Sequence, residues 1–166
     1  MLDFCDKNDC SDEERIKQKI LSLLIDQKRY SRDDIIVDKK FDIIVDNKVH
    51  KSSVDILIKL QEVMFMIIRC ARGSLVTRER EVLSCARIHD SYLIPFSVVT
   101  NGEDAQIIDS VSGEIIGHGL DSIPAKPEAL EILKKIELYK LAHDRIEKEK
   151  RIFLAFDALK CPTECN

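Results

Sequence analysis

The sequence lacks the features that mark a membrane or secreted protein. None of its 166 residues lies in an apolar run approaching the roughly 20 residues that span a bilayer. The first residues, Met1 to Asp6, have neither the basic segment nor the apolar core of a signal peptide. Internal repeats and low-complexity linkers are also missing. These absences predict a single soluble domain with a cytoplasmic location and no membrane partner.

The motifs of several common enzyme classes are absent as well. The glycines at positions 113, 117 and 119 open no helix, so they do not form a phosphate-binding loop. The serines lack the glycine-flanked turn of a nucleophile elbow, and the four histidines are scattered without metal-ligand spacing. The sequence therefore gives no support for a hydrolase triad, a dinucleotide site or a Walker motif.

A strong charge of either sign is missing too, because 26 Lys and Arg oppose 30 Asp and Glu, for a net charge of −4. A mildly acidic chain does not coat nucleic acid indiscriminately, although a local basic patch is still allowed. Five arginines close together in the sequence give such a patch: Arg69, Arg72, Arg78, Arg80 and Arg87. We expect them to contact nucleic-acid phosphates; the alternative is a solvated helix face offset by nearby glutamates.

The six cysteines fall into two groups. In a cytosolic protein they are expected to be thiols or metal ligands rather than disulfides. Cys70 and Cys85 lie in apolar surroundings and are most simply core residues. The other four lie in the polar ends of the chain: Cys5, Cys10, Cys161 and Cys165. They could hold a tetrahedral zinc ion if the two ends meet, although their spacing is looser than in common zinc knuckles; the alternative is a pair of frayed tails.

Hydrophobic periodicity predicts the order of helices and strands in the first half. Ser11-Asp12-Glu13-Glu14 is a capping-box pattern, in which Ser11 caps a helix and Glu14 reaches back to it. This helix should end near residues 28–30. Short β-branched runs then predict four strands, at residues 35–37, 41–45, 54–58 and 63–70. The last of these is almost continuously apolar, as expected of a central strand covered on both faces.

The second half returns to helices. A helix is expected at 74–89, followed by strands at 93–100, 105–109 and 114–117, with a turn at Asn101-Gly102. Residues from 127 to about 159 form either two helices or one long exposed helix. We therefore expect an α/β fold with a mixed β-sheet core flanked by helices over residues 12–125. A polar tail precedes this core over 1–11, and a helical C-terminal extension follows over 126–166.

Two adjacent strands carry the most informative residues. The first places an acid in an apolar run, Val54-Asp55-Ile56, and the second ends in Arg69-Cys70-Ala71. Together with the later Thr100-Asn101-Gly102 and Ile107-Ile108-Asp109, this order resembles the N-terminal domain of the restriction subunit of type I restriction enzymes. The similarity covers roughly residues 12–125. It implies a restriction-endonuclease-like fold of the PD-(D/E)XK nuclease superfamily.

The resemblance also implies a site, but an incomplete one. Such nucleases hold Mg or Mn through carboxylates and usually use a lysine to orient the attacking water. Asp55 matches the first-strand acid and metal ligand, and Glu14 matches a helical glutamate that some members use as an accessory ligand. The acid and the lysine of the acid-x-lysine triplet fall on Arg69 and Ala71, so the site resembles a degenerate one. Arg72 comes one position late and is a poor base.

Two further glutamates, Glu62 and Glu79, could supply a displaced carboxylate, but no spacing argument favours either. An arginine near Asp55 would put a fixed cation where a divalent ion should bind. We therefore predict that Arg69 pairs with Asp55, and that bound Mg is weak or absent. An acid that merely closes a strand is the alternative interpretation of Asp55.

Three hypotheses about function follow. The first is a nuclease-fold protein that has lost catalysis and binds nucleic acid, with DNA as its expected partner. The second is an active Mg- or Mn-dependent endodeoxyribonuclease with a rearranged site that uses Asp55 and Glu14. The third is a non-catalytic interaction module, which would dock a protein partner or a second copy of itself through the C-terminal helices.

Overall fold

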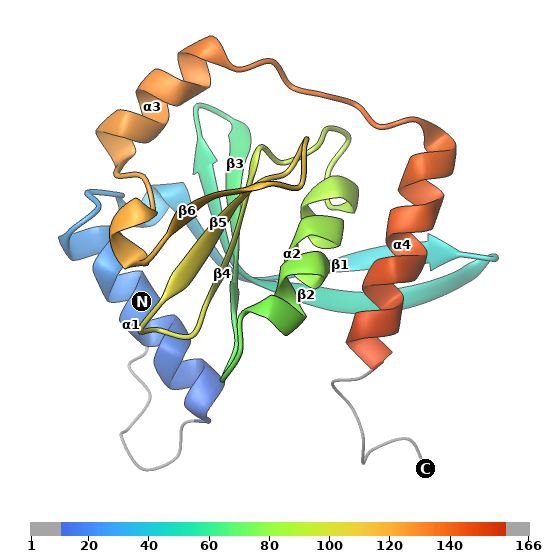
Figure 1. Cartoon of the computed structure of the whole chain (residues 1–166). Coiled ribbons are helices and arrows are strands. Elements are labelled where there is room, and N and C mark those ends of the chain that lie inside the picture. The colour runs from blue at the N-terminus through green and yellow to red at the C-terminus, as the bar shows by residue number, and fades with distance from the viewer. Residues whose placement is uncertain (1–10, 159–166) are drawn as a thin grey trace.

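The computed structural model describes residues 11–158, and Figure 1 shows their arrangement. Four helices are present in this range: α1 (Asp12–Asp26), α2 (Val76–Ile88), α3 (Lys126–Lys135) and α4 (His143–Ala158). Six strands accompany them: β1 (Ile35–Val45), β2 (Lys48–Leu60), β3 (Val63–Cys70), β4 (Phe96–Thr100), β5 (Ala105–Asp109) and β6 (Ile115–His118). Two short 3-10 turns lie at Arg32–Asp34 and Leu120–Ser122.

The strands form one mixed sheet in sequence order, from β1 at one edge to β6 at the other. Only β3 and β4 run parallel; every other neighbouring pair is antiparallel. Parallel neighbours need a long connection, and α2 provides it. The observed α/β architecture, a mixed sheet flanked by helices with a helix at the C-terminal end, confirms the expected fold class.

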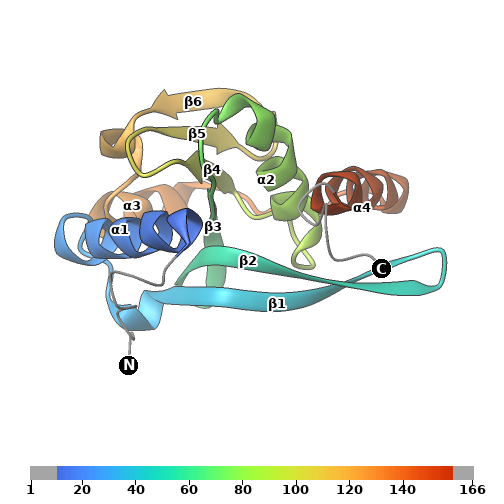
Figure 2. The ribbon, with the colours of Figure 1, turned by 90° about the horizontal axis from the view of Figure 1, so that it is seen from below.

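Each face of the sheet is covered by two helices (Figure 2). One core cluster joins Ile20 and Leu24 of α1 and Ala129 of α3 to the sheet. The second joins α2 and Phe153 of α4 to the opposite face. Strand β3 separates the two clusters and contributes fully buried residues to both, which confirms its prediction as a central strand.

Local sequence signals explain several boundaries. The Ser11 hydroxyl accepts a hydrogen bond from the Glu14 backbone N–H at 3.2 Å, so the predicted cap begins α1. Asp46 and Asn47 both have positive φ, of 52° and 62°, as a type I′ turn requires, and they close the β1–β2 hairpin. The C-terminal region forms two helices rather than one.

Two strands are longer than predicted. Strand β2 begins at Lys48, six residues before the expected start. The charged residues between 37 and 41 suggested a break, but β1 runs without interruption from Ile35 to Val45. Asp38 adopts a positive φ of 52°, and its carboxylate accepts hydrogen bonds from the Lys17 ammonium at 2.8 and 3.1 Å. Lys39 and Lys40 continue the pairing with β2. A contact with α1, which is distant in sequence, therefore keeps a polar segment inside a strand.

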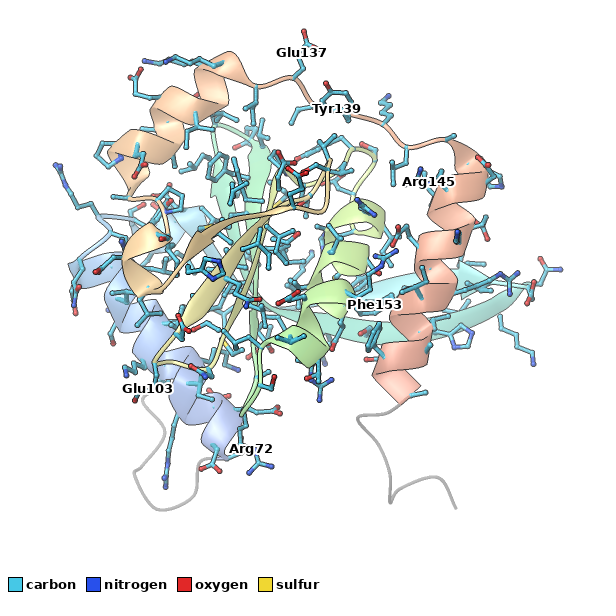
Figure 3. All side chains as sticks on the ribbon, in the orientation of Figure 1. Arg72, Glu103, Glu137, Tyr139, Arg145 and Phe153 are labelled. Carbon is cyan, nitrogen blue, oxygen red and sulfur yellow. The ribbon has the colours of Figure 1, made fainter. Side chains whose placement is uncertain are left out.

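Helix α4 is attached through a buried carboxylate. Glu149 is 2% exposed and accepts hydrogen bonds from both guanidinium arms of Arg80, at 2.8 and 2.9 Å, and from Arg87 at 2.8 Å. Burial alone would raise the pKa of Glu149, but the hydrogen bonds from the two arginines outweigh it and hold the pKa below its ordinary value. Figure 3 shows Phe153, one turn further along, on the side of α4 that faces α2.

We expect Glu149→Gln to destabilise the protein by about 3 kcal/mol, because it leaves two arginines facing a neutral group in a buried position. Glu147→Gln is the matched control, since Glu147 forms only an i,i+3 pair with Lys150 on the same helix. That change should cost much less, because the pair is in contact with solvent. Urea denaturation of the two variants measures both values; equal losses would contradict the anchoring role of Glu149.

A half-buried histidine, whose two ring nitrogens are shielded from solvent, lies on the same face of the sheet. The His89 ring contacts Phe41, with centroids 5.0 Å apart, and neither ring nitrogen has a hydrogen-bond partner among the described residues. Burial lowers the pKa of His89, although the nearby Asp90 carboxylate opposes this effect. The unfolded chain therefore binds a proton at a higher pH than the folded one does, and the protein should lose stability as the pH falls below about 6.5.

His89→Phe should reduce this loss, because phenylalanine keeps the ring contact and binds no proton. The free energy of unfolding, measured from pH 7.5 down to about pH 5, should fall less steeply in the variant than in the native protein. His118→Phe, at an exposed position, is the comparison variant. The interpretation fails if the His89 variant keeps the native slope.

Candidate active site

Asp55 lies at the point where two strands separate. Strands β2 and β3 pair from Leu60 and Val63 as far as Ile56 and Ile68, and Asp55 is the next residue of β2. Its carboxylate Oδ2 accepts a hydrogen bond from the Cys70 backbone N–H at 2.8 Å. A backbone donor beyond the last pair of the ladder is thereby satisfied, which buried backbone groups require. Asp55 has a structural role at this fork.

The Arg69 guanidinium lies between two carboxylates. Its Nη1 is 3.6 Å from Asp55 Oδ2, and its Nε is 3.4 Å from Glu81 Oε1. The predicted pairing of Arg69 with Asp55 is therefore confirmed. Burial alone would lower the pKa of Arg69, but the carboxylates of Asp55 and Glu81 outweigh it and hold the pKa above its ordinary value. Arg69 is therefore a fixed cation.

The second carboxylate of this site was not identified from the sequence. Glu81 is 1% exposed, on α2, and also pairs with Arg78 at 3.0 Å. Its spacing of three residues from Arg78 is a signal that could have found the pair, but the same spacing also fits an exposed helix face. Glu62, in contrast, is in the β2–β3 turn with its side chain 90% exposed and pairs with Lys59.

Glu14 belongs to a second ionic cluster. Its carboxylate is 2.6 Å from the ammonium of Lys17, which also binds Asp38. The hydrogen bond from Lys17 lowers the pKa of Glu14 more than burial raises it. Lys17 is only 7% exposed, so this cluster connects α1 to β1 within the protein. The role of Glu14 as an accessory metal ligand stays a prediction.

Each of the five arginines expected to meet phosphates has a carboxylate partner. Besides the Arg69 pairs, the structure contains Arg72–Asp12 at 2.9 Å, Arg78–Glu81, Arg80–Glu149 and Arg87–Glu149. Arg87 is 8% exposed and also donates to the carbonyl oxygens of Ser110 and Val111. Arg72, labelled in Figure 3, is the most exposed of the five. The five arginines are therefore held in several separate intramolecular ion pairs.

A divalent metal ion at Asp55 would need further oxygen ligands close to that carboxylate. Within residues 11–158, no three His, Cys, Asp or Glu side chains are grouped so that they could hold one. The guanidinium of Arg69 adds a fixed positive charge next to the best-placed carboxylate. The zinc site suggested at Cys5, Cys10, Cys161 and Cys165 lies outside the described residues. Cys70 and Cys85 are buried thiols, as expected of core cysteines.

These features define the class of the protein: an α/β protein whose mixed sheet carries an acid at the fork between two antiparallel strands and a parallel strand pair beyond it. A family model described as "Type I restriction enzyme R protein N terminus" matches residues 12–124, and the chain belongs to that family. No curated protein and no solved structure matches the chain. Within residues 11–158, no helix has the length and apolar character needed to span a membrane.

The structural role of Asp55 can be separated from its charge. Asp55→Ala removes the acceptor of the Cys70 N–H and should lower the free energy of unfolding by about 2 kcal/mol, since a buried donor loses its partner. Asp55→Asn keeps an acceptor oxygen and should cost less. Urea denaturation compares the two variants, and an alanine variant as stable as the native protein would contradict the proposed hydrogen-bonding role.

Proposed function

We propose that this domain is a nuclease-fold module that binds DNA without hydrolysing it. Its family supports the link to DNA, because the family description names a restriction enzyme, which acts on DNA. The loss of hydrolysis rests on one observation, the Arg69 guanidinium between the carboxylates of Asp55 and Glu81. The resemblance to PD-(D/E)XK nucleases would require an acid at that position.

The charge of Arg69 opposes metal binding by a large margin. The guanidinium beside Asp55 would repel a divalent ion held there. Two such charges about 4 Å apart repel each other by on the order of 8 kcal/mol at an effective dielectric constant of about 20. An arginine cannot relieve it by losing a proton, because its pKa is above about 12. The ion pairs that hold Arg69 would also have to break before the side chain could move away.

The lysine expected to assist the attacking water is missing as well. Its place, directly after the end of β3, is taken by Ala71, which is 4% exposed and carries no polar side-chain group. Lys17 is buried, but its ammonium binds Glu14 and Asp38 and is held as a cation, since those two carboxylates and their hydrogen bonds raise its pKa above the ordinary value in spite of burial. A protonated lysine does not accept a proton from water.

A cleavage assay tests the proposal. Supercoiled plasmid is incubated with Mg²⁺ or Mn²⁺ and either the native protein or Asp55→Asn, and nicked and linear products are measured on a gel. We expect no cleavage by either protein. The asparagine variant is preferred to alanine because it retains an acceptor for the Cys70 N–H.

Cleavage by the native protein that disappears in Asp55→Asn would overturn the proposal. It would establish the alternative, an active endonuclease with a rearranged site. Cleavage of equal rate in both would place any activity away from Asp55. Binding is measured separately, by the fluorescence anisotropy of a labelled DNA duplex, so that loss of hydrolysis and loss of DNA affinity are distinguished.

A further inference from the structure

The distal part of the β1–β2 hairpin is a two-stranded ribbon with one uncovered face. Because β2 pairs with β3 only from Ile56 onward, the segment from Lys39 to Val54 has no third strand. Figure 2 shows this ribbon extending from the sheet beside α4. Side chains alternate between its two faces. One face is covered by α4 and α2, and all the side chains of the other are exposed: Lys40, Asp42, Ile44, Val49, Lys51 and Ser53.

Helix α4 holds the ribbon in place from its covered face. Phe153 packs against Phe41, with ring centroids 5.8 Å apart, and the Lys150 ammonium donates to the Ile44 carbonyl oxygen at 3.3 Å. Arg151 binds the carboxylate of Asp46 through both of its terminal nitrogens, at 2.9 and 3.1 Å. The acid at the turn is thereby neutralised, and the ribbon is braced along most of its length.

Lysines of the ribbon differ from the arginines of β3 and α2 in their ion pairing, because those arginines are bound to carboxylates. Lys40 and Lys51 lie on the uncovered face, whereas Lys48 pairs with Val45 of the other face, beside the turn. All three are exposed and form no ion pair or side-chain hydrogen bond with a described residue. Asp42 is the one acid on the uncovered face. An unpaired ammonium can release a condensed counterion from a nucleic acid, whereas an arginine already bound to a carboxylate must first give up that partner.

We propose that the uncovered face and the tip of this ribbon form the surface that contacts double-stranded DNA, with Lys40 and Lys51 on that face and Lys48 beside the turn meeting phosphates. A two-stranded β-ribbon is one of the two elements that fit the major groove of B-form DNA. The exposed β-branched side chains of Ile44 and Val49, 55% and 58% exposed, lie opposite each other near its tip, where apolar groups can contact thymine methyls. This inference rests on the proposed function, since it presumes that the domain binds DNA.

The test is the salt dependence of binding to a fluorescein-labelled DNA duplex, measured by anisotropy. The triple variant Lys40→Gln, Lys48→Gln, Lys51→Gln should bind on the order of 100-fold more weakly at about 0.1 M salt. The slope of log K against log salt concentration should become smaller by about 3, because each phosphate contact contributes about 0.9. The variant should remain as stable as the native protein, since its three side chains are exposed.

The matched control removes the same charge elsewhere. Lys134→Gln, Lys135→Gln, Lys140→Gln changes three exposed lysines on α3 and in the segment after it, and Figure 1 shows α3 away from the ribbon. It should keep the native affinity and slope. If the control loses as much as the ribbon variant, or if the ribbon variant binds like the native protein, the ribbon is not the contact surface, while the proposed DNA binding stands. If the native protein binds no duplex, both proposals fail.

A comparison of DNA with RNA tests separately whether the ribbon lies in the major groove. An A-form RNA duplex has a deep, narrow major groove that side chains do not enter. An RNA duplex of the same length and sequence should therefore bind the native protein more weakly than the DNA does. Equal affinity for the two duplexes would overturn the major-groove placement.

Discussion

The separation of β2 from β3 after the Ile56–Ile68 pair is the constraint on which the other features of the molecule depend. Beyond this point β3 keeps a partner on one side only, the parallel strand β4, and the Asp55 carboxylate accepts the Cys70 N–H at the fork. The hairpin that leaves the sheet presents an apolar face of its own, with Ile43 and Val45 buried. Helix α4 packs against that face through Phe153 and shields its apolar side chains from solvent.

Buried carboxylates determine which of the cationic side chains are held in ion pairs. Glu81 and Glu149 lie almost completely inside the protein, where an unpaired charge is costly, so each draws two arginines toward it. The arginines of β3 and α2 are used in these internal contacts. The same principle disfavours a metal at Asp55 and leaves the lysines of the β1–β2 ribbon as available cations. One electrostatic requirement therefore bears on both proposals, the loss of hydrolysis and the place of DNA contact.

The prediction of the fold succeeded where the signal is local. The Ser11 cap and the apolar run of β3 each follow from a few neighbouring residues, and the structure confirms them. The break assumed between residues 37 and 41 was wrong because the structure of that segment depends on Lys17, some twenty residues earlier. The pairing of Arg69 with Asp55 was predicted from the family resemblance, which brings together two strands of known order.

The other residues of the site could not be identified from the sequence. Glu81 and Glu149 stand in charged stretches that suit an exposed helix, and only the packing of α2 against β3 and of α4 against α2 buries them. Phe153 follows Glu149 by one helical turn, which is consistent with a buried side of α4. This spacing does not show against which element that side packs. The arginine cluster shows the same difficulty, because closeness in sequence does not tell which side chains are already paired.

The amino-acid sequence by itself determined the type and order of most helices and strands, the family, and the replacement of the expected acid and lysine by Arg69 and Ala71. These depend on residue identity and on periodicities of two and 3.6 residues, which are local properties. The tertiary structure alone decided which carboxylates are buried, which cations remain unpaired and which face of the ribbon is open. Those properties depend on distances between segments far apart in the chain, and electrostatic energies change steeply with such distances and with burial.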